Sequence, residues 1–326
     1  MLEKFERIKL GHFPTPIEHL KNISKYLGGP NIFIKRDDCT GLATGGNKTR
    51  KLEFLIPDAI KNKAELVVTV GAVQSNHARQ TAAACTLMGL KCLIILEQRV
   101  KDPPEVYMNS GNVFLDKLFG ADVKICPKNE NFLKYYEKII EDLKSKGTNV
   151  YFIPGGGSNS IGALGYVECL NEIIKENNKY NFSHIVHATG SAGTQAGLLA
   201  GRKYFNCNIP VIGICIRYDK ATQLNKVYSE AKKTCEKLHC NVLDKSEVVV
   251  YDEYIGPGYG EPSDDMIEAT NLLAKREGIL LDPVYSGKGF AGLIGLIKNK
   301  KLTKNDNVLF IHTGGAVSLS AYEWAF

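Results

Sequence analysis

Five basic residues surround a pair of glycines in the segment IKRDDCTGLATGGNKTRKLEFL, residues 34–55. Lys48 directly follows the Gly-Gly-Asn turn and begins a stretch that is typical of a helix. The like charges around it should lower the pKa of its amine and favour nucleophilic attack on a carbonyl. Lys51 lies on nearly the same face of such a helix. An ordinary turn before a helix would explain the glycines as well, so the segment alone leaves open whether one amine reacts with a carbonyl-bearing cofactor.

Glycine-rich turns are the second chemical feature, and several of them follow apolar runs. They read TVGAVQSNHARQ (69–80), FIPGGGSNSIGALGY (152–166), HATGSAGTQAG (187–197) and FIHTGGAVS (310–318). Glycine lets the backbone approach a ligand, and a helix that begins next offers free N–H groups to an anion. The third turn interleaves the hydroxyls of Ser191 and Thr194 with glycines, but has no GK[ST] ending and no GxGxxG followed by a ribose-binding acid. It therefore favours a phosphate without a nucleotide.

A different anion site is indicated by QSNHARQ. Ser75 and Asn76 are good capping residues for a helix that begins there, and capping alone would explain them. The same hydroxyl, amide and free backbone donors also suit a substrate carboxylate.

Positioning these turns requires strands that end near one another. Seven apolar runs are typical of strands, at 65–70, 91–96, 122–126, 149–153, 184–188, 211–216 and 307–311. Helix-compatible segments lie between many of them, at 74–88, 131–146, 163–179, 194–204 and 264–277. The alternation indicates an α/β fold with parallel sheets covered by helices on both faces. We expect two sheets with separate cores, interleaved along the chain, and a ligand where strand ends meet helix starts.

The composition excludes several classes of protein. The 326 residues are 44% apolar and 23% charged, as in ordinary globular chains. No apolar run is long enough to span a bilayer and the charged N-terminus is unlike a secretory signal, which predicts a cytoplasmic protein without membrane contact. A net charge of +6 from scattered lysines argues against nucleic acid and suits a small anionic ligand. Nine cysteines without a CxxC pair predict reduced thiols and no metal site.

Six motifs then occur in an order that resembles a known family. They are GGNKTRKLEFL, QSNHARQTAA, TGSAGTQAG, GPGYG, LDPVYSGK and HTGG. The order resembles pyridoxal-phosphate (PLP) enzymes of fold type II, the tryptophan-synthase-β fold. The branch in question holds D-cysteine desulfhydrase, L-cysteate sulfo-lyase and aminocyclopropane-carboxylate deaminase. The resemblance implies two interleaved three-layer domains, a large PLP-binding one of residues 1–51 plus 159–326 and a small one of residues 52–158, and a homodimer.

The resemblance also assigns the cofactor contacts. Lys48 is the lysine that bonds to the cofactor aldehyde, and Lys51 supports the phosphate or a neighbouring carboxylate. Asn76 contacts the ring oxygen, while Ser286 and Thr313 lie beside the ring nitrogen. The phosphate is held by Thr189, Gly190, Ser191, Ala192, Gly193 and Thr194.

Substrate contacts follow in the same way. Ser75, Asn76 and His77 meet the substrate carboxylate, and the resemblance places Tyr259 and Tyr285 on the reacting face. The residues expected to take part in catalysis are Lys48, Ser75, Tyr259 and Tyr285. Lys48 takes the proton from Cα, or a tyrosine does so from the opposite face.

Three positions separate members of the branch. In the deaminase pattern a glutamate follows DPVY, a leucine stands in HLGG, and glutamine replaces His77. Here Ser286 and Thr313 offer hydroxyls, which would leave an adjacent ring nitrogen largely unprotonated and the ring a weaker electron sink. That is tolerable where a good leaving group departs from Cβ. The resemblance therefore favours β-elimination to pyruvate and ammonia over the opening of a cyclopropane.

The leaving group is sulfite from L-cysteate or sulfide from D-cysteine. A sulfonate needs extra cationic contacts, and Arg99 and Arg217 follow strands that should end near the cleft, although solvated surface arginines would look the same. We prefer cysteate. A catalytically silent binding module on the same fold is a further alternative, against which the retained Lys48 argues.

Overall fold

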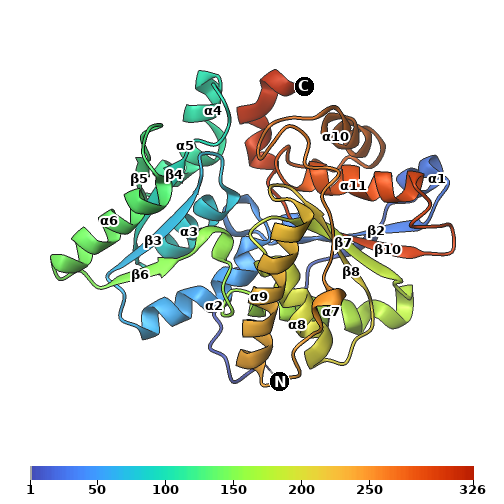
Figure 1. Ribbon diagram of the computed structural model, residues 1–326, viewed down its shortest axis with the longest axis horizontal. Helices are drawn as coiled ribbons and strands as arrows, with labels where there is room; N and C mark the ends of the chain where they lie inside the picture. The colour runs from blue at the N-terminus through green and yellow to red at the C-terminus, as the bar shows by residue number, and fades with distance from the viewer. Residues whose placement is uncertain (1) are drawn as a thin grey trace.

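The computed structural model describes residues 2–326, which form two sheets covered by helices (Figure 1). The larger sheet has the strand order β1-β2-β10-β7-β8-β9. Its strands are β1 (Ile17–His19), β2 (Asn31–Arg36), β7 (His184–Thr189), β8 (Val211–Cys215), β9 (Val249–Tyr251) and β10 (Asn307–His312). Only β1 is antiparallel to its neighbour. The sequence analysis found β7, β8 and β10 but did not identify β1, β2 and β9.

The smaller sheet is entirely parallel, with the order β5-β4-β3-β6. Its strands are β3 (Leu66–Ala72), β4 (Lys91–Glu97), β5 (Asp122–Ile125) and β6 (Val150–Ile153). The chain forms β1 and β2, then builds the smaller sheet, and returns to the larger one with β7. The predicted α/β fold with interleaved, parallel-rich units is therefore confirmed, whereas the domain boundaries after residues 51 and 158 stay a prediction.

Helices cover both faces of each sheet. They are α1 (Lys21–Leu27), α2 (Lys48–Lys61), α3 (Asn76–Leu87), α4 (Glu105–Asn109), α5 (Gly111–Leu118), α6 (Phe132–Ser145), α7 (Leu164–Tyr180), α8 (Gly193–Tyr204), α9 (Lys220–Leu238), α10 (Asp264–Glu277) and α11 (Ser286–Lys298). Figure 1 shows α10 and α11 on one side of the larger sheet and α7, α8 and α9 on the other. Since α2 packs against both α3 and α7, it joins the two halves of the molecule.

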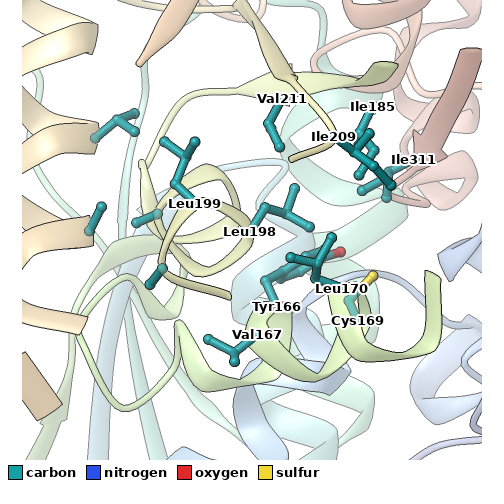
Figure 2. Packing of buried hydrophobic residues seen from close by; sticks show 14 of the residues in the cluster. Tyr166, Val167, Cys169, Leu170, Ile185, Leu198, Leu199, Ile209, Val211 and Ile311 are labelled. Carbon is teal, nitrogen blue, oxygen red and sulfur yellow. The ribbon is translucent and has the colours of Figure 1, made fainter. Parts of the chain in front are cut away.

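The core between α7 and α8 shows how the sequence pattern becomes packing (Figure 2). The inward positions of α7, among them Tyr166, Val167 and Leu170, recur at helical spacing and are fully buried. They pack against Leu198 of α8, and burial of such a leucine contributes about 1.5–3 kcal/mol. A Cβ on Gly197 would lie 2.2 Å from the carbonyl oxygen of Ala163, so the two helices approach at a glycine.

The strand order brings the chemically interesting turns to one place. In parallel sheets the carboxyl ends of the strands share an edge, and ligands bind there. β3 leads to Ser75, β7 to the turn before α8, and β10 to Thr313. Within residues 2–326, no helix has the length and apolar character needed to cross a bilayer.

Candidate active site

Two adjoining cavities meet at Lys48, between the carboxyl ends of the two sheets. One measures about 30 Å³ and the other about 290 Å³. The smaller is lined by the predicted residues Lys48, Asn76, Thr189, Gly190, Ser191, Ala192, Thr194, Tyr285 and Thr313. The larger is lined by the predicted residues Lys48, Ser75, His77, Arg99, Gly190, Ser191, Arg217, Tyr259 and Tyr285. Lys51, Gly193 and Ser286 line neither cavity, and we call the two together the cleft.

A larger hollow of about 790 Å³ lies elsewhere, between the N-terminal segment and α7. None of the predicted site residues lines it. Its buried cation Lys35 pairs with Glu172 at 2.8 Å, and Arg7 pairs with Glu53 at 2.6 Å. Because these charges are already paired with one another, the cleft is the better candidate for the active site.

The turn before Lys48 is possible only with glycine. Gly45 and Gly46 have φ of 81° and 134°, and a Cβ on Gly45 would lie 1.9 Å from the Asp38 carbonyl oxygen. This turn directs Lys48 into the cleft, where its Nζ donates to Asn47 Oδ1 at 2.8 Å.

Burial lowers the pKa of the Lys48 amine to about 8. Asp282 opposes this shift and Arg79 adds to it. A lowered pKa leaves more of the amine unprotonated at neutral pH, which is the nucleophilic form.

An anion cradle forms where β7 leads into α8. The first amides of α8 have no carbonyl partner in a preceding turn, and Ala192 takes a φ of 76° to bring the chain round. Ser158 Oγ donates to Ser191 Oγ at 2.8 Å and accepts from the Gly193 amide at 3.1 Å. The hydroxyls, amides and glycines suit a phosphate group.

Lys51, on α2, contacts the same cradle from outside the cavity. Its Nζ donates to Ser158 Oγ at 3.3 Å and to the Gly156 carbonyl at 2.9 Å. Burial, with a contribution from Lys48, holds the pKa of Lys51 well below its ordinary value. The sequence analysis quoted the GGGSNS turn but did not single out Ser158, whose link to Ser191 appears only in the folded chain.

The opposite end of the smaller cavity presents an amide and a hydroxyl. Asn76 Oδ1 accepts from Arg79 Nη1 and Asn112 Nδ2, both at 3.0 Å, and Thr313 lines the cavity. The Ser286 hydroxyl instead donates to Asp282 Oδ1 at 2.6 Å and accepts from the Asp282 amide at 2.8 Å. Of the two residues assigned to the ring nitrogen, only Thr313 therefore faces the cleft, and Ser286 stands behind it.

Ser75 and His77 stand at the start of α3. Ser75 Oγ accepts from the Ala78 amide at 3.2 Å, which is a helix cap. The Thr69 hydroxyl donates to the Ile153 carbonyl at 2.9 Å, so the 2.8 Å contact with His77 Nε2 requires that His77 donates. Burial, with the Lys48 and Lys51 charges, holds the pKa of His77 well below its ordinary value. His77 is thus neutral and its Nε2 proton is already used, so its contact with a carboxylate stays a prediction.

The two predicted tyrosines lie together on the wall of the cleft. The hydroxyls of Tyr259 and Tyr285 share a short hydrogen bond, and Lys48 Nζ lies 5.8 Å from the centre of the Tyr285 ring. Burial and the neighbouring Tyr259 raise the pKa of Tyr285 well above its ordinary value, so it keeps its proton at neutral pH. The sequence analysis missed Lys288, whose Nζ donates to Ile255 and Gly258 carbonyls at 2.6 and 2.7 Å and holds the Tyr259 loop.

The outer part of the larger cavity is cationic. Arg99 pairs with Glu97 at 2.5 Å and stacks over Tyr259, whereas Arg217 and Lys226 lie 4.8 and 5.0 Å from the Tyr218 ring centre. Of the described residues that line the two cavities, none is acidic. Lys226 was not predicted, because an exposed helix lysine looks ordinary in sequence.

The residues of the cleft fit pyridoxal phosphate. A buried amine of lowered pKa, a hydroxyl- and amide-lined anion cradle, and an amide whose oxygen is already bonded stand around one cavity. They match the aldehyde, the phosphate and the ring oxygen of that cofactor.

Comparisons with known proteins agree with this geometry. The family model described as pyridoxal-phosphate dependent enzyme matches residues 8–314. A solved structure titled as an ACC deaminase homologue is 39% identical, with 99% of this chain and 95% of that one covered and a TM-score of 0.90. A hydrogen sulfide-producing enzyme from Fusobacterium nucleatum is 18% identical, with 94% and 96% covered and a TM-score of 0.65, and shows the fold alone. The chain belongs to the family of pyridoxal-phosphate dependent enzymes.

Proposed function

We propose that this protein is a PLP-dependent carbon–sulfur lyase that acts by β-elimination on a sulfur-containing amino acid. L-Cysteate is the first candidate and D-cysteine the second. With one water consumed, cysteate yields pyruvate, ammonia and sulfite, and cysteine yields pyruvate, ammonia and sulfide. The observation that carries the proposal is the cationic, acid-free cavity beside Lys48.

Lys48 is the proposed attachment point of the cofactor. Pyridoxal phosphate, when bound, supplies an aldehyde that bonds to amines and a ring that takes up the electron pair of a broken Cα–H bond. The amine with a pKa of about 8 supports the first role. Lys51, Ser158, Ser191 and the first amides of α8 would hold the phosphate.

The start of α3 is proposed to bind the substrate carboxylate. Ser75 and Asn76 stand there beside the positive end of the helix, and carboxylates are stabilised at such helix starts. A substrate held there would have its Cα beside Lys48, whose Nζ would take the Cα proton. Tyr285 keeps its own proton and is therefore a donor, not the base.

The cations further out would receive the leaving group. Arg217 and Lys226 have no acidic partner among the residues described, while Arg99 is held by Glu97. A sulfonate accepts several charge-assisted hydrogen bonds at once, so these residues favour cysteate over cysteine.

Deamination of aminocyclopropane-carboxylate is the second candidate. The 39% identity to a structure titled as an ACC deaminase homologue favours it. Thr313, which lines the smaller cavity, and Ser286, which supplies no carboxylate at its position, argue against it, because the ring is a weaker electron sink without a carboxylate beside its nitrogen. A homodimer and a cytoplasmic location are proposed from the family resemblance.

The first experiment tests the amine. Purified protein is loaded with pyridoxal phosphate, reduced with borohydride and digested, and we expect mass spectrometry to find the cofactor on Lys48. Lys48→Ala should lose the visible band of the lysine-bound cofactor and about three orders of magnitude or more in turnover. Lys51→Met, one turn along, should keep the band and bind the cofactor more weakly. Label on Lys51 in the wild type would contradict the proposal.

The second experiment tests the reaction. L-Cysteate, D-cysteine, β-chloro-D-alanine and aminocyclopropane-carboxylate are supplied separately, and pyruvate, 2-oxobutanoate, sulfite and sulfide are measured. Pyruvate with sulfite is the expected result. Release of 2-oxobutanoate from the cyclopropane, without pyruvate from the sulfur compounds, would establish the deaminase instead.

A further inference from the structure

A buried arginine connects two parts of the cofactor site without lining the cleft. Arg79 lies on α3, one turn after Asn76, and is fully buried. Its Nη1 donates to Asn76 Oδ1 at 3.0 Å and to Asn112 Oδ1 at 2.5 Å. Its Nη2 donates to the Gly45 carbonyl at 2.8 Å. One guanidinium group therefore holds both the start of α3 and the turn that precedes Lys48.

The first consequence concerns the orientation of Asn76. Its Oδ1 accepts from Arg79 and also from Asn112 Nδ2, so the oxygen end of the amide is fixed away from the cleft. A flipped amide would place an NH₂ group against the guanidinium, with two donors facing each other. Nδ2 is thereby the end available to a hydrogen-bond acceptor in the smaller cavity, which Asn76 lines.

The space in front of that amide is kept open. A Cβ on Gly315 would lie 2.5 Å from Asn76 Nδ2, and this glycine has a φ of 105° that other residues rarely adopt. The turn after β10 thus leaves the amide nitrogen unobstructed.

The second consequence is electrostatic. In the part of the chain that the structure describes, Arg79 Nε and both carboxylate oxygens of Asp116 have no hydrogen-bond partner. Burial raises the pKa of Asp116 to about 8, so this acid, which acts on Arg79, is mostly uncharged at neutral pH. Burial also lowers the pKa of Arg79 to about 10, which still leaves it a cation. Of the charged groups that act on Lys48, Asp282 raises the pKa of the amine and Arg79 lowers it.

We propose that Arg79 is a positioning residue of the cofactor site, which orients Asn76 so that its NH₂ group faces an anionic oxygen on the cofactor ring and ties this amide to the turn that presents Lys48. This rests on the assignment of Lys48 and Asn76 proposed above. A buried cation without a paired carboxylate costs stability, and its hydrogen bonds to two elements of the site give a functional reason for its presence.

The test compares Arg79→Met, which removes both charge and hydrogen bonds, with Arg79→Lys, which keeps the charge but cannot reach the same acceptors. Cofactor affinity is measured by titration, and the pH midpoint of the visible band is recorded for each loaded protein. We expect Arg79→Met to weaken cofactor binding by about 10–100-fold and to raise the midpoint by about one pH unit, because a cation near the bonded nitrogen is lost. Arg79→Lys should weaken binding but leave the midpoint within a few tenths of a unit of the wild type. A purely structural role would not separate the two variants in this way.

Two further variants keep the proposal open to contradiction. Asn112→Ala removes the other donor to Asn76 Oδ1 and should weaken cofactor binding by about 3–10-fold. This variant also tests the proposal if Arg79→Met does not fold. Asp116→Asn leaves every hydrogen bond of Arg79 intact and should bind the cofactor as the wild type does. Wild-type affinity and pH midpoint in Arg79→Met, or wild-type affinity in Asn112→Ala, would overturn the proposal. Borohydride labelling of Lys48 in these variants separates such a result from failure of the proposed function, since only the latter moves the label.

Discussion

Two buried arginines flank the cofactor site, and their surroundings differ. Arg50, on the side of α2 opposite the cleft, pairs with Asp37 and Glu172, each at 2.8 Å. Arg79, on α3, donates to two amides and a carbonyl and pairs with no carboxylate in the described structure. Both are almost fully buried, so the contrast lies in the counter-charge and not in exposure.

The acids near them respond in opposite directions. Burial acts to raise the pKa of Asp37, but the Arg50 charge holds this pKa below its ordinary value. Burial raises the pKa of Asp116 to about 8, although the Arg79 charge acts to lower it. The Arg50 charge thus acts mainly on the carboxylates that pair with it, whereas the Arg79 charge, without a paired carboxylate in the described structure, acts on the amine of Lys48. A paired arginine suits a structural role, and an unpaired one suits a site in which the pKa of an amine must be lowered.

The largest loss of stability is expected when the paired arginine is removed. Arg50→Met would leave the buried Asp37 carboxylate without its paired cation and Glu172 with Lys35 alone, and we expect a loss of about 3–5 kcal/mol in the free energy of unfolding. Urea unfolding of the loaded enzyme measures this loss, and Arg50→Lys serves as the charge-preserving control. A loss under about 1 kcal/mol would mean that the two regions do not differ as described.

The second change should stabilise the protein, with an effect that depends on pH. The folded protein keeps the Asp116 proton up to about pH 8, while the unfolded chain releases it near the ordinary value of 3.8. Wild-type stability therefore falls as pH rises between these values, by up to about 1.4 kcal/mol per pH unit, and Asp116→Asn should remove this dependence. Unfolding at pH 5 and pH 8 should show the advantage of the variant growing with pH. The control Asp37→Asn should be less stable than the wild type except in acid. The Asp37 carboxylate, whose pKa is lowered, stabilises the folded protein above pH 3.8, and this stabilisation disappears as the pH falls through the folded pKa. Equal effects of Asp116→Asn at both pH values would contradict the assignment.

The same contrast recurs at the mouth of the cleft, where Arg99 pairs with a carboxylate and Arg217 has no such partner in the part of the chain that the structure describes. Arg217→Ala should lower kcat/KM for L-cysteate by about 10–100-fold and spare D-cysteine, since only the sulfonate engages the free guanidinium. Arg99→Ala is the matched control and should cost less with cysteate, because Glu97 already occupies that side chain. Equal losses of Arg217→Ala on both substrates would argue against sulfonate recognition by this residue.

The smallest effect is expected where a pair is exposed. Lys128 and Asp102 lie 3.4 Å apart, with side chains 62% and 76% exposed. Lys128→Ala should change the free energy of unfolding by less than about 0.5 kcal/mol, because water and salt screen such a pair. Urea unfolding in low and high salt measures it, and a loss comparable to that of Arg50→Met would show that pairing alone, without burial, decides the cost.

Several residues show how far the sequence could predict the site. Lys48 was assigned by a resemblance to which the local Gly-Gly-Asn turn before a helix contributes, and all seven predicted strands lie in the two sheets. Ser158 was missed because its relevance depends on Ser191, which lies 33 residues away in the chain, and Lys226 was missed because an exposed helix lysine looks ordinary in sequence. Ser286 was assigned to the ring nitrogen by resemblance; its hydroxyl bonds to Asp282 in the folded chain, and the assignment stays a prediction.

The sequence by itself determined the strand and helix alternation and the glycine turns, because hydrophobic periodicity and backbone φ preferences act over a few neighbouring residues. Only the tertiary structure decided which of the basic residues are paired with a carboxylate. Arg50 bonds to a glutamate 122 residues away, whereas Arg79 bonds to a carbonyl 34 residues away and, among residues 2–326, to no carboxylate. Desolvation and Coulomb energy depend on distance in space and on the exclusion of water, so the ionisation of Lys48 is a property of the fold.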